Sequence, residues 1–326
     1  MPNEIMTVTG PISADDLGFT LAHEHIFLDL MPDAWVGGNY MNDLDVAQLE
    51  LQRYKDAGGV TLVDQTSGGL RENDHDLLID EDLNHLKHAE AIKLMAEKTG
   101  LNIILGCGWY RETYYPQRLW RMKTDEIAEE MLQDLTEGID GTNIRAGFIG
   151  EIGAHFNWVS AIEERVLRAA ARAQVKTNVA LGTHATRGTQ GLDQLDVLEQ
   201  EGVDLRRVVV AHSGGFPRHK YHAEIARRGA YISYDRMGNL KNANPYDKKR
   251  TLQHIKKIID AGLINNLIFS HDVCYTHDWH TYGGSGYDFL STEALPMLQE
   301  EIGMTEEQFN TIMLGNSRRL LTGEGL

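Results

Sequence analysis

Cysteine, long apolar runs and secretion signals are nearly absent from this sequence. The 326 residues include only two cysteines, Cys107 and Cys274, which is too few for a disulfide framework. No segment approaches the roughly 18 consecutive apolar residues of a membrane helix, and Met1 to Ile5 lack the basic and apolar character of a signal peptide. These absences predict a cytoplasmic protein without a membrane partner, in which each cysteine is a small buried residue.

Positive charge is also scarce. The chain has 31 Lys and Arg against 48 Asp and Glu, which gives a formal net charge of −17. The dense basic run Lys248-Lys249-Arg250 is too short to form the cationic stripe that wrapping a phosphate backbone requires. We therefore exclude nucleic acid as a partner and expect this run on a solvated helix face.

Eight short apolar segments of strand length recur along the chain, each followed by enough residues for a helix. They span 18–22, 59–63, 102–105, 146–149, 177–181, 207–211, 230–234 and 266–270. The clearest helix begins at Ser160, which forms a capping-box signature with Glu163. This repetition predicts an α/β fold, a (β/α)8 TIM barrel with residues 1–326 in a single domain. An open doubly wound sheet is the alternative, but no Gly-rich phosphate loop follows the first segment.

Polar residues stand at the ends of most predicted strands. The carboxyl ends of barrel strands converge on one mouth, so these side chains are expected to meet in space. Six of them are candidate metal ligands: His23, His25, Glu151, His184, His212 and Asp272. Six ligands exceed the needs of one catalytic ion, so we predict two divalent ions about 3.5–4 Å apart with a shared carboxylate. Imidazoles with carboxylates favour zinc, with manganese, cobalt or iron as alternatives. Strand-end histidines bonded only to backbone are the competing interpretation.

Aromatic residues follow the third and the eighth predicted strands. Trp109 and Tyr110 follow the third, and the segment 275–287 contains Trp279 and a Gly-rich stretch. Loops after barrel strands build the active site in this architecture, so we expect these aromatics to shape a pocket for a small-molecule substrate.

Taken in order, these motifs resemble the phosphotriesterase family of the amidohydrolase superfamily. The resemblance runs nearly end to end and rests on Thr20-Leu21-Ala22-His23-Glu24-His25, Ile144-Arg145-Ala146-Gly147-Phe148-Ile149, Gly182-Thr183-His184, Val210-Ala211-His212, Asp235-Arg236-Met237-Gly238 and Ser270-His271-Asp272. It implies a binuclear metal hydrolase on a distorted barrel, often a homodimer. By the same resemblance, His23, His25 and Asp272 hold the more buried ion, and His184 and His212 hold the more exposed one.

The fourth strand end departs from the pattern of many family members. Those members bridge the metals with a carboxylated lysine, whereas this segment reads Ile149-Gly150-Glu151-Ile152-Gly153. Glu151 resembles the bridge found in the branch called phosphotriesterase homology proteins. A glutamate offers the same two anionic oxygens but is shorter, so we expect a local backbone adjustment. The difference leaves phosphotriester hydrolysis as a weak side activity.

The last two strand ends resemble those of phosphotriesterase-like lactonases. The similar segments are Asp235-Arg236-Met237-Gly238 and Ser270-His271-Asp272-Val273-Cys274, with Asp278-Trp279 beyond them. The likeness implies that Arg236 and an aromatic residue, here Tyr110, hold the lactone. With Trp109 and Trp279 they form the predicted substrate-binding set. A structural salt bridge is the alternative role for Arg236.

The expected chemistry is hydrolysis by a hydroxide held between two ions, which opens a lactone or a related carboxylic ester. Asp272, the predicted catalytic residue, would orient the hydroxide and carry its proton to the leaving oxygen. An amidohydrolase acting on an N-acyl amine or a carbamate is the first alternative. A barrel that binds metal or ligand without catalysis is the second.

Overall fold

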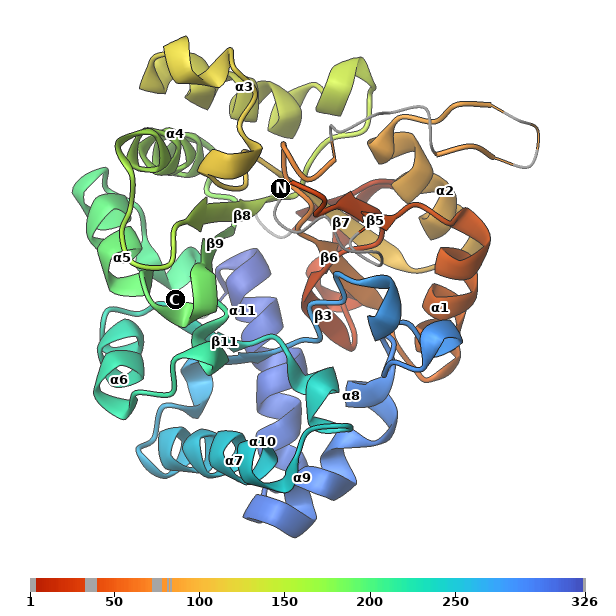
Figure 1. Ribbon diagram of the computed structural model, residues 1–326, viewed down its shortest axis with the longest axis vertical. Helices are drawn as coiled ribbons and strands as arrows, with labels where there is room; N and C mark the ends of the chain where they lie inside the picture. The colour runs from red at the N-terminus through yellow and green to blue at the C-terminus, as the bar shows by residue number, and fades with distance from the viewer. Residues whose placement is uncertain (1–3, 33–39, 72–77, 81, 83, 325–326) are drawn as a thin grey trace.

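Eight parallel strands form the centre of the computed structural model, which describes residues 4–32, 40–71, 78–80, 82 and 84–324. The strands lie in the order β12-β11-β10-β9-β8-β7-β6-β3, with helices around them (Figure 1). They are β3 (Thr20–Glu24), β6 (Thr61–Asp64), β7 (Asn102–Cys107), β8 (Phe148–Ala154), β9 (Leu181–Ala185), β10 (Val208–Ala211), β11 (Tyr231–Tyr234) and β12 (Leu267–Phe269). The TIM-barrel prediction is confirmed, and the doubly wound alternative is wrong.

The helices lie around the strands, on the outside of the barrel (Figure 1). They are α1 (Leu44–Asp56), α2 (His88–Thr99), α3 (Thr124–Thr136), α4 (Ala161–Thr177), α5 (Gly191–Gln200), α6 (His219–Arg227), α7 (Pro245–Asp260), α8 (Phe289–Thr292), α9 (Ala294–Ile302), α10 (Glu306–Asn310) and α11 (Ser317–Thr322). Two short antiparallel pairs complete the description: β1 (Glu4–Thr7) with β2 (Gly10–Ser13), and β4 (Leu28–Asp29) with β5 (Tyr40–Met41).

Helix α4 begins as its sequence predicts but ends later than expected. Ser160 Oγ accepts from the Glu163 N–H (3.2 Å), and the Glu163 carboxylate accepts from the Ser160 N–H (2.9 Å), so the predicted capping box is confirmed. The helix continues to Thr177, and Asn178 ends it in the left-handed conformation (φ 55°). The fifth strand therefore begins at Leu181 rather than at the predicted residue 177.

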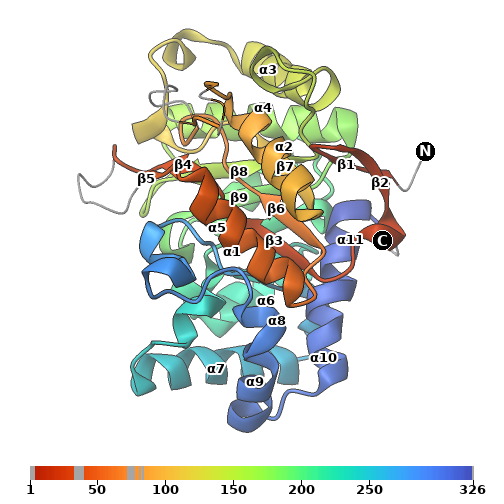
Figure 2. The ribbon, with the colours of Figure 1, turned by 90° about the vertical axis from the view of Figure 1, so that its right-hand side faces the viewer.

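Alternate strand residues face two different layers, as the period of two requires. Val63, Ile104, Phe148, Val209 and Ile268 pack inside the barrel with residues of the β1–β2 hairpin and α11. Figure 2 shows this hairpin beside α11. Because Asn102, the first residue of β7, donates from its side chain to the Asp16 carbonyl (3.0 Å), the N-terminal segment lies at the amino ends of the strands. The opposite, carboxyl end remains available for the polar residues.

The barrel closes between β3 and β12 through a buried carboxylate. The Glu24 carboxylate accepts hydrogen bonds from Ser270 Oγ (2.7 Å) and from the N–H groups of His271 (2.7 Å) and Val273 (3.0 Å). In addition, the Asp272 N–H donates to the His23 carbonyl (3.1 Å). The first and last strand ends, which both carry candidate ligands, are thus joined directly.

Three smaller predictions can also be compared with the structure. Both cysteines are buried and unpaired. The run 248–250 lies on α7, where Lys249 and Arg250 are exposed. Among the described residues, none of the helices is long and apolar enough to cross a bilayer.

Candidate metal centre

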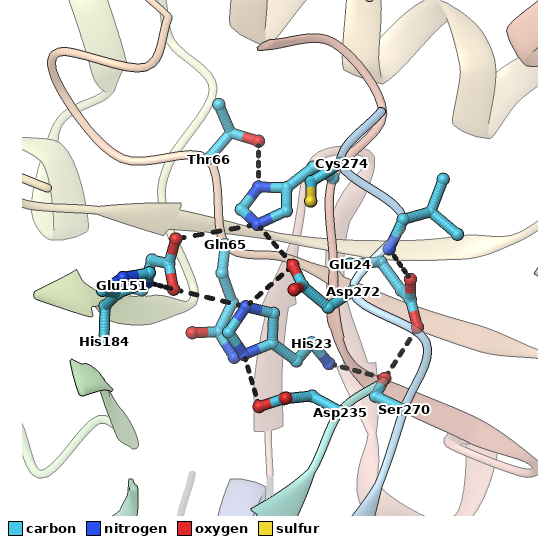
Figure 3. A network of polar contacts seen from close by, with 12 residues as sticks. His23, Glu24, Gln65, Thr66, Glu151, His184, Asp235, Ser270, Asp272 and Cys274 are labelled. Carbon is cyan, nitrogen blue, oxygen red and sulfur yellow. Dashed lines mark hydrogen bonds and ion pairs between the residues drawn. The ribbon is translucent and has the colours of Figure 1, made fainter. Parts of the chain in front are cut away.

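All six predicted ligands meet at the carboxyl end of the barrel, as the sequence pattern suggested. Figure 3 shows His23, Glu151, His184 and Asp272 within this cluster. His23 lies in β3, Glu151 in β8 and His184 in β9, while His25, His212 and Asp272 follow β3, β10 and β12. Five of the six are buried, and His212 is partly buried. Residues as far apart in the sequence as His23 and Asp272 therefore share one site.

Glu151 lies at the middle of the cluster. Its Oε2 is 2.9 Å from His184 Nδ1, 3.3 Å from His23 Nε2 and 3.4 Å from His212 Nε2. Its Oε1 is 3.7 Å from His25 Nε2. Burial alone would raise the pKa of Glu151, but the close approach of the His184 ring, and of the His212 and His23 rings, holds that pKa well below its usual range. This carboxylate is ionised and faces both halves of the cluster, as a shared ligand must.

The backbone of β8 is irregular around Glu151, where we expected a local adjustment because glutamate is shorter than a carboxylated lysine. The pairing of β8 with β9 is irregular between Ile149 and Ile152, on either side of Glu151. Gly150 within that stretch has φ 134°, and a Cβ atom there would lie 2.5 Å from the Gly182 carbonyl oxygen. The Glu151 N–H donates to the Gln65 carbonyl (3.0 Å), and Ser67 Oγ donates to the Glu151 carbonyl (2.9 Å). These bonds hold the irregular segment in place.

Two of the ligands have an unusual backbone conformation. His212 has φ 57° and Asp272 has φ 49°, both in the left-handed region that non-glycine residues seldom adopt. Such strain of about 1–3 kcal/mol is typical of functional positions, where the surrounding structure enforces it. For Asp272, part of that enforcement comes from the bonds of Glu24 to the N–H groups of His271 and Val273.

The ring nitrogen that faces away from the cluster has its own partner in three of the histidines. His25 Nδ1 is 2.9 Å from Thr66 Oγ1, His184 Nε2 is 3.3 Å from Tyr110 Oη, and His212 Nδ1 is 3.1 Å from Asp235 Oδ1. These contacts leave Nε2 of His25, Nδ1 of His184 and Nε2 of His212 directed at Glu151. Partners of this kind orient metal-binding histidines and set their tautomers.

Asp235 is a site residue that the sequence analysis did not select. It is buried, and in addition to its contact with the His212 ring its Oδ2 accepts from the His212 N–H (2.6 Å). The same oxygen lies 3.8 Å from His23 Nδ1. Its position at the end of the seventh strand could have identified it, because Glu151 and Asp272, the other carboxylates of the cluster, were predicted from their positions at strand ends.

The donor set fits metal ions. Both ring nitrogens of His23 are buried without a hydrogen-bond partner, although buried polar atoms are normally satisfied. His184 Nδ1 and His212 Nε2 lie 2.7 Å apart, close enough for the lone pairs of both nitrogens to bind the same ion. Burial lowers the pKa of His184 to about 4, which keeps its imidazole neutral near pH 7. Neutral imidazoles and ionised carboxylates are the ligands that zinc and related divalent ions prefer.

A cavity of about 660 Å³ opens over this cluster. The predicted substrate-binding residues Tyr110 and Arg236 both line it. Arg236 also contacts Asp272: its Nη1 donates to the Asp272 carbonyl (2.6 Å) and to Asp272 Oδ2 (3.2 Å). The two interpretations of Arg236, substrate contact and salt bridge, are therefore compatible in one side chain.

The two tryptophans of the predicted substrate-binding set lie elsewhere, and neither is among the described residues that line the cavity. Trp279 is fully buried, and its Nε1 donates to Tyr287 Oη (3.2 Å), which in turn donates to the His25 carbonyl (2.6 Å). Through Tyr287, Trp279 therefore supports the backbone of the candidate ligand His25. Trp109 is buried beside the Arg118 guanidinium, 5.0 Å from its ring centroid. Loop position alone did not distinguish side chains that face the cavity from side chains that pack beneath it.

His271 belongs to the scaffold of the site. Its Nδ1 lies 3.3 Å from the Glu24 carboxylate, and its Nε2 accepts from the Leu290 N–H (3.1 Å). Both nitrogens therefore face groups outside the cluster, and Asp272 alone represents the eighth strand end among the candidate ligands.

Comparison with known proteins agrees with this geometry. The phosphotriesterase family model matches residues 3–321. The chain is 30% identical to the phosphotriesterase homology protein of Escherichia coli, over 94% of this chain and 98% of that protein. It is 27% identical to the N-acetyltaurine hydrolase of Danio rerio, over 98% of each.

Two solved structures are similar over nearly the whole chain. A resiniferatoxin-binding protein from Rhodobacter sphaeroides has a TM-score of 0.87 at 29% identity and covers 98% of this chain and 94% of its own. A variant of a PTE-like lactonase from Deinococcus radiodurans has a TM-score of 0.81 at 28% identity and covers 97% and 99%. With a family match over almost its full length, the chain belongs to the phosphotriesterase family of hydrolases.

Proposed function

We propose that this hydrolase uses two divalent metal ions to open a lactone or a related carboxylic ester. The observation that carries the proposal is the central position of Glu151, whose carboxylate oxygens lie 2.9–3.7 Å from ring nitrogens of the four candidate histidine ligands, while Asp272 Oδ1 lies 3.4 Å from His25 Nε2. A single ion would leave several of these buried donors unused. When bound, divalent ions in such a site lower the pKa of water and polarise a carbonyl oxygen.

We infer that Asp272 moves the proton. Its Oδ1 lies 3.4 Å from His25 Nε2, inside the cluster, while its Oδ2 is held by Arg236. Burial would raise the pKa of Asp272, but the hydrogen bond with His25 and the charge of Arg236 lower it far below the usual range. Asp272 is therefore ionised, as a group that accepts a proton from water must be, and we infer from its position that it passes this proton to the leaving oxygen.

Tyr110 can orient the substrate from the other side of the cavity. Its hydroxyl lies 3.3 Å from His184 Nε2, and burial together with the charge of Glu151 raises the pKa of Tyr110 well above 10.0. The hydroxyl therefore stays protonated and can donate a hydrogen bond to a substrate oxygen. Arg236, on the Asp272 side, offers further donors to the same substrate.

Hydrolysis of an N-acyl amide is the second candidate, and the N-acetyltaurine hydrolase among the relatives favours it. The same donor set can activate water against an amide, but the leaving nitrogen needs a proton more strongly than an alkoxide does. Phosphotriester hydrolysis stays a predicted side activity, because Glu151 occupies the place of the carboxylated lysine.

The test is a matched comparison of substrates. The purified chain is loaded with zinc, manganese or cobalt, and proton release is followed with γ- and δ-lactones, while product amine is followed with small N-acyl amines. Glu151→Ala serves as the blank. We expect metal-dependent opening of at least one lactone at a higher kcat/KM than the corresponding N-acyl amine. Faster cleavage of the amine would move the assignment to amidase, and inert lactones in the metal-loaded protein would refute lactone opening.

Zinc as the bound metal, a homodimer and a cytoplasmic location stay predictions. Elemental analysis of the protein as isolated tests the first, sedimentation equilibrium tests the second, and fractionation of the source cells tests the third.

A further inference from the structure

The charges that line the cavity differ from those of the chain as a whole. Three arginines reach it, Arg111, Arg187 and Arg236, in a protein whose net charge is −17. The lining acids Glu151, Asp235 and Asp272 all belong to the candidate metal cluster. Among the described residues, Asp247 is the remaining acid of the lining, and it already contacts Asn244 Nδ2 (2.6 Å) and Arg250 Nη2 (3.4 Å). The wall outside the metal cluster is therefore cationic.

Arg187 has no anionic partner among the described residues. Arg236 is held by Asp272. By contrast, none of the described carboxylates forms an ion pair with Arg187, whose guanidinium lies over the Phe156 ring at 5.4 Å from the centroid. Stacking on a ring orients a guanidinium and leaves its N–H groups free to bind an anion.

The turn that carries Arg187 is held rigidly, three residues after the ligand His184. Thr186 Oγ1 donates to the Ala154 carbonyl (2.6 Å), and the Thr189 hydroxyl donates to the carbonyls of Phe156 and Thr186. Arg187 itself has φ 54°, a left-handed conformation that is strained for a long side chain. The structure thus presents this guanidinium at a defined place on the cavity wall, instead of leaving it on a mobile surface loop.

Arg111 adds a second oriented cation, on the loop after β7. Its guanidinium lies 5.2 Å from the Tyr110 ring centroid and 5.5 Å from that of Tyr114. Because Tyr110 contacts the ligand His184, this cation is also tied to the candidate metal centre.

We propose that the cavity selects substrates that carry an anionic group, such as a carboxylate, sulfonate or phosphate, and that Arg187, with Arg111, binds this group while the reacting carbonyl faces the metal cluster. The proposal rests on the hydrolase function proposed above and specifies its substrate class. Arg187 is then a specificity-determining residue with no part in the chemical step.

The test uses two lactones with the same ring: γ-butyrolactone with a carboxylate on the γ carbon, and γ-valerolactone, which has a methyl group there. Arg187→Gln removes the charge. Arg218→Gln is the matched control, because Arg218 is also exposed and stacked on a ring, that of Phe216 at 5.5 Å, yet is not among the residues lining the cavity.

We expect the wild-type protein to prefer the anionic lactone, and Arg187→Gln to lower its kcat/KM about tenfold, mainly through KM, as loss of a charge-assisted hydrogen bond would do. The value for γ-valerolactone should change by less than about twofold, as should both values in Arg218→Gln. Equal effects of Arg187→Gln on the two lactones, or no preference in the wild-type protein, would overturn the proposal.

A binding measurement separates this proposal from the function on which it rests. Titration calorimetry compares levulinate with the neutral methyl propyl ketone, neither of which can be hydrolysed, on metal-loaded wild-type protein and on both variants. Tighter binding of levulinate that Arg187→Gln abolishes and Arg218→Gln preserves supports the anion site even if no lactone is opened. Equal binding of levulinate to all three proteins refutes the site even if lactones are opened.

Discussion

Glu24→Gln should weaken metal binding, although Glu24 is not a candidate ligand. Its fully buried carboxylate accepts three hydrogen bonds, from Ser270 Oγ, the His271 N–H and the Val273 N–H, at 2.7, 2.7 and 3.0 Å. Glutamine has the same shape but only one acceptor oxygen. In its best orientation the amide keeps the first two bonds and turns its NH2 group toward the Val273 N–H. Loss of one bond to a charged acceptor and weakening of two others should lower the free energy of unfolding by about 3 kcal/mol.

The effect on metal follows from the position of Asp272, which lies between the two residues whose N–H groups Glu24 holds. Its left-handed backbone (φ 49°) depends on those bonds. When they weaken, Asp272 can relax to an ordinary conformation and its carboxylate moves away from the cluster. Outer residues of this kind contribute about tenfold or more to metal affinity. We expect a tenfold weaker affinity, within that range, in a titration with a competing chelator, and the lower stability in urea denaturation of the metal-free protein.

Glu50→Gln is the matched control. Glu50, on α1, is also fully buried and accepts three hydrogen bonds, from the N–H groups of His280 and Thr281 (2.9 and 3.0 Å) and from Thr281 Oγ1 (2.8 Å). It holds a loop that carries no candidate ligand and that reaches the centre only through the bond of Tyr287 to the His25 carbonyl. The stability should therefore fall by a similar amount, while metal affinity should stay much closer to the wild-type value than in Glu24→Gln. Equal loss of metal in the two variants, or wild-type affinity in Glu24→Gln, would refute the reasoning.

Three further substitutions test individual roles. Asp272→Asn should keep its metal but lose about a hundredfold or more in kcat, because an amide can bind a cation but cannot carry the proton; wild-type turnover would remove Asp272 from the mechanism. Glu151→Ala should bind fewer than two ions per chain by elemental analysis, since it lacks the shared ligand, and full occupancy would disprove the bridge. Asp134→Asn concerns pH: burial raises the pKa of Asp134 from 3.8 to about 6, so folding favours the protonated form and stability falls as pH rises through that interval. The variant should lose this part of the fall in unfolding free energy measured across the interval, and an unchanged slope would contradict the assignment.

Sequence pattern predicted the barrel and the clustering of the candidate ligands for a simple physical reason. Apolar strands alternate with helices, and the polar residue that ends each strand must lie at the common mouth. The strand that ends at Glu151 shows where this reasoning stops, because its irregular pairing and the close approach of Gly150 to Gly182 depend on the neighbouring strand. Trp279 shows a second limit. It follows the eighth strand as predicted, but its side chain bonds to Tyr287 and does not line the cavity.

The residues that orient the ligands were the hardest to predict, because they come from other parts of the chain. Thr66 lies 41 residues from His25, Tyr110 lies 74 residues from His184, and Asp235 lies 23 residues from His212. Each of these partners occupies one nitrogen of a ring and so determines which nitrogen is directed at Glu151: Nε2, Nδ1 and Nε2 in turn. The sequence position alone gives the residue type of a candidate ligand. Which ring nitrogen faces the cluster depends on the second residue that bonds the other nitrogen. Because each pair joins different strands or the loops that follow them, the geometry of the centre exists only once the barrel has formed.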